Sequence, residues 1–308
     1  MWRKKGLIFC TENNYDWMVS HASVPTAMVL QDGGIRIFFA PRNKKGLSIP
    51  TFIDVAGENP LQVKHVHDRP ILSPGKLGAF DDSGIMPCSV IENAGKVYLY
   101  YVGWNPGVSV PYRNAIGLAV SNDSGLTFKR LFEGPVVDRN IHEPYFTASP
   151  CVFKDEHYWH MWYASATGFV TVNEKAEPLY LIKYAASTNG IDWIRENITC
   201  IHPKSEFEAN ARPTVIKENG IYRMWFTFRG SFDYRDGKDS YRIGYAESND
   251  AKTWKRMDES AGIDVSAEGW DSKMITYPFV LQYKNKKYLF YNGNGFGRSG
   301  IGYAEWKE

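Results

Sequence analysis

Long apolar runs, metal-ligand cysteine pairs and basic blocks are missing from this 308-residue sequence. No apolar run is long enough to span a membrane, and no N-terminal segment has the composition of a signal peptide. The 36 Lys and Arg residues nearly balance the 34 Asp and Glu residues, and they form no basic cluster of the kind that binds nucleic acid. We therefore expect a cytoplasmic protein with neither a membrane nor a nucleic-acid partner.

Cysteine is scarce, and its spacing is not that of a metal site. The four cysteines are Cys10, Cys88, Cys151 and Cys200, and no two of them are close enough in sequence for a zinc motif. Cys88 and Cys151 each follow a proline, so we predict that both fill one equivalent buried position. No ligand motif for calcium is present, and we expect no metal and no cofactor.

Aromatic residues and turn formers are abundant, and they recur at a fixed period. Aromatics make up 15% of the chain, beside 27 glycines, a composition that favours strands and turns. A proline marks the change from polar to apolar residues at intervals of 62, 63, 63 and 65 residues, at Pro25, Pro87, Pro150, Pro213 and Pro278. Such a period indicates a repeated structural unit.

Each unit contains an apolar strand after the proline, a polar turn and an aromatic second strand. The predicted second strands are Ile35–Ala40, Val97–Val102, Tyr158–Ala164, Tyr222–Phe228 and Tyr288–Asn292. Four units add a third strand, beginning at Ile116, Ile182, Ile243 and Ile301. Longer insertions between the second and third strands, such as Thr167–Leu179, are expected to be loops at the rim of a pocket.

Five units of three or four antiparallel strands predict an all-β protein, a five-bladed β-propeller that forms one domain over residues 1–308. The last unit ends soon after its third strand, and the strand-like segment Gly6–Cys10 precedes the first proline. We predict that this N-terminal strand completes the last blade and closes the ring, because closure removes exposed sheet edges.

The polar residues before each proline are the candidate site. In a propeller the first strands line the central channel, so side chains near their starts should meet at one mouth. Every unit except the first brings a carboxylate there. Asp82 and Glu208 lie five residues before their prolines, and Lys273 has the same offset in the last unit. Two such carboxylates could serve as general acid and as base or nucleophile in glycoside hydrolysis, which uses a carboxylate pair.

The polar strand start with its proline, the aromatic second strand and the Ile-Gly-Tyr-Ala-Glu third strand resemble the five-bladed propeller glycosidases. That group includes glycoside hydrolase family 43, the invertase-like enzymes and the mannoside phosphorylases. Trp270-Asp-Ser-Lys-Met274 is similar to a strand start of the phosphorylase branch. The turn Ser121–Phe128 matches the Asp-box of sialidases, but five units rather than six argue against a sialidase.

The resemblance implies a carbohydrate or glycoconjugate substrate and a glycosidase-like activity. On this reading Asp82 is the base or charge stabiliser and Glu208 the proton donor, with Asp271 and Glu143 as further catalytic candidates. The predicted substrate-binding residues are His21, Ser23, Asp81, Asn210, Arg212, Lys273 and Trp104. Arg212, Lys273 and His21 could orient hydroxyls or hold a phosphate.

Two alternatives remain open. The first unit reads His-Ala-Ser-Val-Pro from His21 to Pro25, without the carboxylate that the invertase-like enzymes carry there. This departure favours a propeller that binds a sugar or serves glycan assembly without hydrolysis, including a phosphorylase or a sugar-nucleotide enzyme. The third possibility is a protein-interaction propeller, against which the polar channel residues argue.

Overall fold

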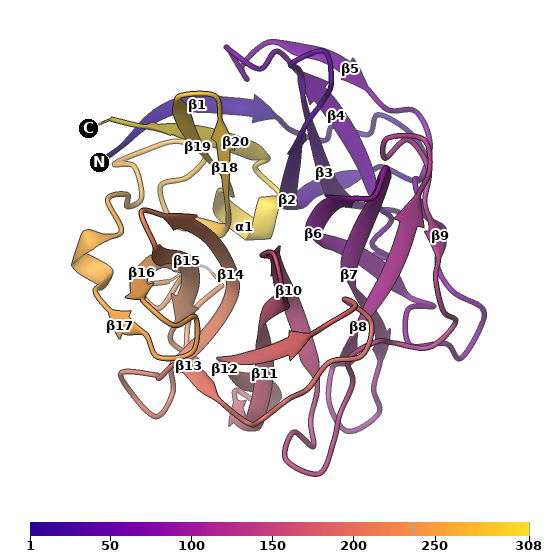
Figure 1. Cartoon of the computed structure of the whole chain (residues 1–308). Helices are drawn as coiled ribbons and strands as arrows, with labels where there is room; N and C mark the ends of the chain where they lie inside the picture. Colours follow the sequence, from indigo (N-terminus) through magenta and orange to yellow (C-terminus); the bar gives the residue numbers. More distant parts are fainter. Residues whose placement is uncertain (236, 308) are drawn as a thin grey trace.

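The repeated unit of the sequence forms one antiparallel sheet per copy in a computed structural model that describes residues 1–235 and 237–307. Five four-stranded sheets stand around a common axis like the blades of a propeller (Figure 1). The predicted fold class, a five-bladed all-β propeller, is confirmed. The described residues add only a short 3₁₀ helix, η1 (Asp258–Ser260), and one helical segment, α1 (Asn294–Gly297).

Each blade runs from an inner strand at the axis to an outer strand, which is short in blades 1 to 4. The strands of blade 1 are β2 (Ser20–Val29), β3 (Ile35–Arg42), β4 (Thr51–Val55) and β5 (Val63–Val66). Those of blade 2 are β6 (Gly84–Asn93), β7 (Lys96–Pro106), β8 (Tyr112–Ser121) and β9 (Lys129–Arg130). Those of blade 3 are β10 (Thr147–Lys154), β11 (Trp159–Val172), β12 (Lys175–Ser187) and β13 (Thr199–Ile201). Those of blade 4 are β14 (Ala209–Glu218), β15 (Ile221–Arg229), β16 (Arg242–Ser248) and β17 (Lys255–Arg256).

Blade 5 joins the two ends of the chain and closes the ring as predicted. It contains β18 (Thr276–Tyr283), β19 (Lys286–Asn292), β20 (Ile301–Trp306) and the N-terminal strand β1 (Trp2–Phe9). β1 pairs antiparallel with β20, from Trp2 opposite Trp306 to Phe9 opposite Ile301. The Trp2 indole also meets the rings of Trp306 and Trp225, with centroids 5.1 and 5.6 Å away. Ring closure is therefore held by aromatic packing as well as by strand pairing.

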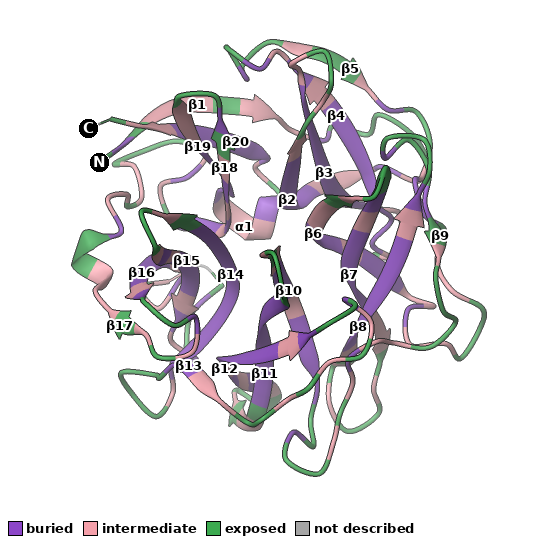
Figure 2. Ribbon diagram, in the orientation of Figure 1, coloured by how far each residue is buried: buried purple, intermediate pink, exposed green. Residues whose placement is uncertain are grey.

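The core lies between the blades, where the aromatic residues of the second strands pack. Trp162, Phe226 and Tyr291 are each fully buried, as predicted. Figure 2 shows the same division, with buried residues along the inner and middle strands and exposed ones in the connecting loops. Cys88 and Cys151 are also buried, which confirms their expected role as small core residues.

Two details of the blades differ from the expectation. Blade 1 has a third strand, β4, which lacks the Ile-Gly-Tyr-Ala pattern of the others. The segment Thr167–Leu179, expected to be a loop, instead continues β11 and β12 as one long hairpin with pairs as far as Val172 opposite Lys175. Its β-branched and aromatic residues suit paired strands, which satisfy their backbone groups better than a loop does.

A β-bulge at the repeat proline shapes every inner strand. In four blades the strand register gains one residue across the proline and the residue before it. That preceding residue has a positive φ: 60° at Val24, 49° at Ser149, 49° at Arg212 and 54° at Tyr277. A bulge re-aims the side chain that it carries, and a left-handed backbone at a non-glycine residue costs about 1–2 kcal/mol. Four residues with this strained backbone therefore lie at equivalent points of four blades, next to the site described below.

Candidate functional site

The residue before each repeat proline lies at the central channel. Val24, Met86, Ser149 and Tyr277 line one pocket there. Arg212, their counterpart in blade 4, does not line this pocket and is only 1% exposed. Its guanidinium donates to the carbonyl oxygens of Cys88 at 2.6 Å and Pro25 at 2.9 Å. Arg212 thus ties blade 4 to the inner strands of blades 1 and 2.

The pocket has a volume of about 350 Å³, at the lower end of the range for small-molecule sites. Its lining is aromatic, small and neutral polar, with one charged group, Arg42. The lining residues in the part of the chain described are Val24, Arg42, Gly46, Ser48, Met86, Cys88, Val102, Trp104, Tyr112, Asn114, Phe146, Ala148, Ser149, Ala164, Tyr180, Ala211, Tyr241 and Tyr277. No carboxylate is among them.

One wall of the pocket carries a pair of hydrogen-bonded tyrosines. The hydroxyls of Tyr180 and Tyr241 bond to each other. The Arg229 Nε lies 3.2 Å from both oxygens, and its guanidinium carbon lies 3.8 Å from the centre of the Tyr234 ring. The pair uses one phenolic hydrogen internally, and the other has no acceptor among the described residues, so it can donate to a ligand.

Three phenols of the pocket, Tyr112, Tyr241 and Tyr277, are protonated at neutral pH. Burial raises the pKa of Tyr112, Tyr241 and Tyr277 far above the ordinary phenol value. Proximity to Tyr180 raises the same three pKa values further, while the Arg229 cation acts in the opposite direction. The wall therefore presents neutral hydroxyl groups and aromatic faces rather than phenolates.

Four of the five predicted carboxylates lie outside the pocket lining, each in an ion pair with a cation near the outer edge of its own blade. In blade 2, Asp81 accepts from Arg130 on β9 at 2.7 Å and from the Tyr101 hydroxyl at 3.0 Å. In blade 3, Glu143 accepts from the Tyr163 hydroxyl at 2.9 Å and lies 3.3 Å from Arg195, which precedes β13. The side chains of Asp81 and Glu143 are 0% and 1% exposed.

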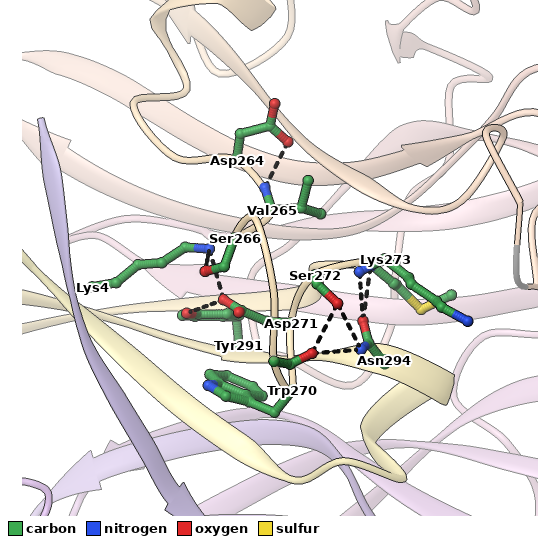
Figure 3. Close-up of polar contacts among 12 residues, drawn as sticks. Lys4, Asp264, Val265, Ser266, Trp270, Asp271, Ser272, Lys273, Tyr291 and Asn294 are labelled. Carbon is green, nitrogen blue, oxygen red and sulfur yellow. Dashed lines mark hydrogen bonds and ion pairs between the residues drawn. The ribbon is translucent and has the colours of Figure 1, made fainter.

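The same arrangement recurs in blades 4 and 5. In blade 4, Glu208 is 2.6 Å from Arg256 on β17. In blade 5, Asp271 is 2.6 Å from Lys4 on β1 and accepts from the Tyr291 hydroxyl at 2.9 Å (Figure 3). We call these four pairs the blade latches: Asp81–Arg130, Glu143–Arg195, Glu208–Arg256 and Asp271–Lys4.

Comparison with known proteins places the chain in a family. No family model matches the sequence. Over 306 residues the chain is 35% identical to Rv1502, an uncharacterized protein of Mycobacterium tuberculosis, and the match covers 98% of each chain. The protein belongs to the Rv1502 family. A stretch of 167 residues is also 28% identical to the 1,2-beta-oligomannan phosphorylase of a Thermoanaerobacter species, over 53% of each chain.

Solved structures share the fold of this Rv1502 family member at low sequence identity. A glycosyl hydrolase from Bacteroides ovatus superposes with a TM-score of 0.76 at 15% identity, covering 100% of this chain and 94% of that one. A thermostable family-43 glycoside hydrolase gives 0.69 at 15% identity, covering 96% and 93%. The GH32 beta-fructofuranosidase BmSUC1 of Bombyx mori gives 0.59 at 13% identity, covering 92% and 61%. The resemblance to five-bladed glycosidase-like propellers is thereby confirmed at the level of the fold.

In this Rv1502 family member the predicted carboxylates do not come together as expected. Glu143, Glu208 and Asp271 lie in three separate latches, not around one channel mouth. Asp82 and Glu208 are not equivalent despite their equal offset, since Asp81 is the latch residue of blade 2. Asp82 is half-buried, accepts from the Gly78 amide and the Ser83 hydroxyl at 2.8 Å, and has no ion-pair partner in the described residues. Its catalytic role stays a prediction.

The predicted substrate-binding residues are also divided. Trp104 lines the pocket, whereas the Ser23 hydroxyl donates to the Phe296 carbonyl at 2.6 Å and is buried. Asn210 is buried, and neither atom of its amide has a partner among the described residues. The exposed Lys273 points away from Asp271 in Figure 3 and bonds Asn294 only through its backbone amide.

Sequence reasoning missed the residues that line the pocket, although signals for some of them were present. Tyr277 and Ser149 directly precede repeat prolines, and the bulge explains why that position, rather than an earlier one, faces the channel. The latch cations also had a signal. Each follows an aromatic residue by two positions, in the pairs Phe128/Arg130, Trp193/Arg195, Trp254/Arg256 and Trp2/Lys4. No comparable sequence signal indicates Arg42, Tyr180 or Tyr241.

Among residues 1–235 and 237–307, no helix is both long enough and apolar enough to cross a bilayer. The same residues contain no group of three or more His, Cys, Asp or Glu side chains placed to hold a metal ion.

Proposed function

We propose that the protein binds a saccharide in the central pocket and serves glycan assembly or transfer rather than hydrolysis by a carboxylate pair. The observation that carries this proposal is the lining of the pocket. It combines aromatic faces with neutral hydrogen-bond donors, and no described carboxylate takes part in it.

The lining suits the two kinds of surface that a sugar ring presents. Trp104, Tyr112 and Phe146 offer apolar faces for the C–H side of a pyranose. The Asn114 amide and the free phenolic hydrogen of the Tyr180–Tyr241 pair offer polar partners. Recognition of small molecules by mostly apolar walls with a few placed polar groups is the general pattern. The names of the similar proteins, which include a phosphorylase of oligomannan and several glycoside hydrolases, support a carbohydrate ligand.

The test is a titration of the protein with a panel of neutral monosaccharides and disaccharides, in which calorimetry or ligand-observed NMR measures binding. We expect saturable binding of at least one sugar, and a loss of affinity of roughly tenfold in Trp104→Ala, the range for one buried aromatic contact. Trp17→Ala is the matched control, because Trp17 is also half-buried but stacks on Tyr15 outside the pocket. Absence of binding to the whole panel, or equal losses in both variants, would contradict the proposal.

A second candidate, hydrolysis of a glycosidic bond with Asp82 as the acting carboxylate, is favoured by one observation. Asp82 is the one predicted catalytic residue without an ion pair in the described part of the chain. Its neighbour Ser83 donates its backbone amide to the carbonyl of Trp104, which lines the pocket.

Aryl glycosides and oligosaccharides, with and without phosphate, test this second candidate. If Asp82 acts in the reaction, Asp82→Asn loses turnover of these substrates by roughly a hundredfold or more. Asp32→Asn is the control, because Asp32 accepts a loop amide at 2.8 Å in the same way, on another blade. Turnover that survives in Asp82→Asn would exclude the role.

A further inference from the structure

Arg42, the one cation among the described residues that line the central pocket, has no partner among those residues. Arg42 ends β3, and its backbone pairs with Ser20 on one side and with Ser48 on the other. Residues paired across antiparallel strands project from the same face, so the side chains of Arg42 and Ser48 leave their strands on the same side. Both line the pocket, and neither side chain makes a hydrogen bond within the described residues.

Other arginines that are removed from solvent are already bonded. Arg36, Arg130, Arg195 and Arg256 each form an ion pair with a carboxylate, and Arg229 has carbonyl and phenol oxygens on all its nitrogens. The other arginines for which the described residues offer no side-chain partner, Arg3, Arg113 and Arg298, are exposed to solvent. Arg42 is only half-exposed, and a partly desolvated cation without a counter-charge is costly unless a ligand provides one.

The surroundings of Arg42 are electropositive. Burial lowers the pKa of the His21 imidazole to about 4, and the cations Arg42 and Arg298 add to this effect. His21 is therefore neutral at pH 7 and adds no positive charge, and the smaller part of the lowering, which Arg42 and Arg298 cause, comes from their positive charge. The pocket lining that the structure describes holds no carboxylate that would repel an anion.

We propose that Arg42 and Ser48 bind the phosphate of a phosphorylated saccharide, either a sugar phosphate or a nucleoside diphosphate sugar. This inference rests on the proposed function, since the sugar itself would occupy the aromatic part of the same pocket. Guanidinium and phosphate form parallel charge-assisted hydrogen bonds. A phosphate has more acceptor oxygens than a carboxylate, so it can accept from the Ser48 hydroxyl as well.

The experiment measures dissociation constants for matched probes at fixed salt: neutral hexoses, their 1-phosphates, nucleoside diphosphate hexoses, hexuronic acids and inorganic phosphate alone. We expect at least one phosphorylated probe to bind roughly tenfold or more tightly than its neutral hexose, a gain within the range of charge-assisted hydrogen bonds. The tighter of the two phosphorylated classes identifies the source of the phosphate.

Three variants distinguish a specific contact between Arg42 and the phosphate from a general effect of positive charge. Arg42→Gln should abolish the preference for phosphorylated probes and retain binding of neutral hexoses, and Arg42→Lys should restore part of that preference. Lys45→Gln removes an exposed cation from the same loop, outside the pocket lining, and should leave the preference intact.

Four results would overturn the inference: no gain for any phosphorylated probe, equal gains for the uronic acids, equal binding of inorganic phosphate alone, or an unchanged preference in Arg42→Gln. In each case neutral hexoses that still bind leave the proposed function in place. A protein that binds no saccharide at all contradicts both proposals.

Discussion

The blade latches and the central pocket both take polar groups out of water, but they differ in whether those groups already have partners. In the latches each carboxylate meets a cation and, in three of the four, a tyrosine hydroxyl. In the pocket, Arg42 and Ser48 have no bonded partner among the described residues. Burial of charge therefore does not by itself mark a functional site, because a paired charge can be structural. The unpaired group is the better indicator.

The latches also explain why acids precede every inner strand after the first. Each carboxylate lies in the chain that leads into β6, β10, β14 or β18, and its partner lies at the outer edge of the same blade. In blade 5 that outer strand is the N-terminal β1, so the Lys4–Asp271 pair also fastens the ring closure (Figure 3). The latch is thus a repeated device for holding a blade together from edge to edge.

The largest effect should come from breaking a latch. Arg130→Met leaves the Asp81 carboxylate buried with the Tyr101 hydroxyl as its remaining partner. Removing one member of a buried ion pair costs about 3–5 kcal/mol, which urea unfolding would measure as a lower midpoint with an unchanged slope. The double variant Asp81→Asn/Arg130→Met should recover part of this loss, because no uncompensated charge remains. A single variant as stable as the wild type would refute the structural role of the latch.

Replacing one tyrosine of a blade latch and one of the pocket wall by phenylalanine distinguishes the two regions by their effects on stability and on saccharide binding. Tyr291→Phe removes a hydroxyl that donates to Asp271 and should lower the free energy of unfolding by about 1.5–3 kcal/mol, as for a hydrogen bond to a charged group. Tyr241→Phe removes the hydroxyl that bonds to Tyr180 in the pocket wall, while Arg229 Nε keeps the Tyr180 oxygen as an acceptor, so it should cost only about 1 kcal/mol, with a several-fold loss of saccharide affinity. Tyr291→Phe should leave that affinity unchanged. The reverse pattern would contradict the division into structure and site.

The fold was predictable from the sequence because it depends on local, repeated signals. The prolines, the aromatic second strands and the third strand at Ile243 or Ile301 recur at one period, and each repeat forms a sheet whose register is fixed by its own turns. The candidate site was not predictable in the same way. Asp81 lies 49 residues from its latch partner Arg130, and the offset of an acid from its proline does not reveal which way its side chain turns.

The pH dependence of stability should distinguish His21 from the latches. Its pKa is about 4 in the folded protein against an ordinary value of 6.5, so the unfolded chain binds more protons between these values. Stability should therefore rise with pH from about 4 to 6.5. Allowing for partial solvent exposure, this contribution is about 1–2 kcal/mol.

Carboxylates also titrate in this pH range. Comparing the urea midpoints of His21→Gln and wild type at several pH values separates the contribution of His21 to stability from theirs. In His21→Gln the urea midpoint should rise less steeply with pH. His157 is exposed, so His157→Gln should keep the pH dependence of the wild type. Identical slopes in His21→Gln and wild type would show that the folded protein does not hold His21 in its neutral form.

The smallest effect is expected at an ion pair with the same geometry as a latch but without its burial. Lys76 and Glu133 are 2.6 Å apart, against 2.7 Å for Arg130 and Asp81, yet their side chains are 84% and 83% exposed. Water and salt already solvate both charges, so pairing adds little. Lys76→Gln should leave the urea midpoint unchanged within error where Arg130→Met lowers it strongly. Equal shifts in the two variants would mean that distance, rather than burial, determines the strength of these pairs, and the contrast between latch and surface would fail.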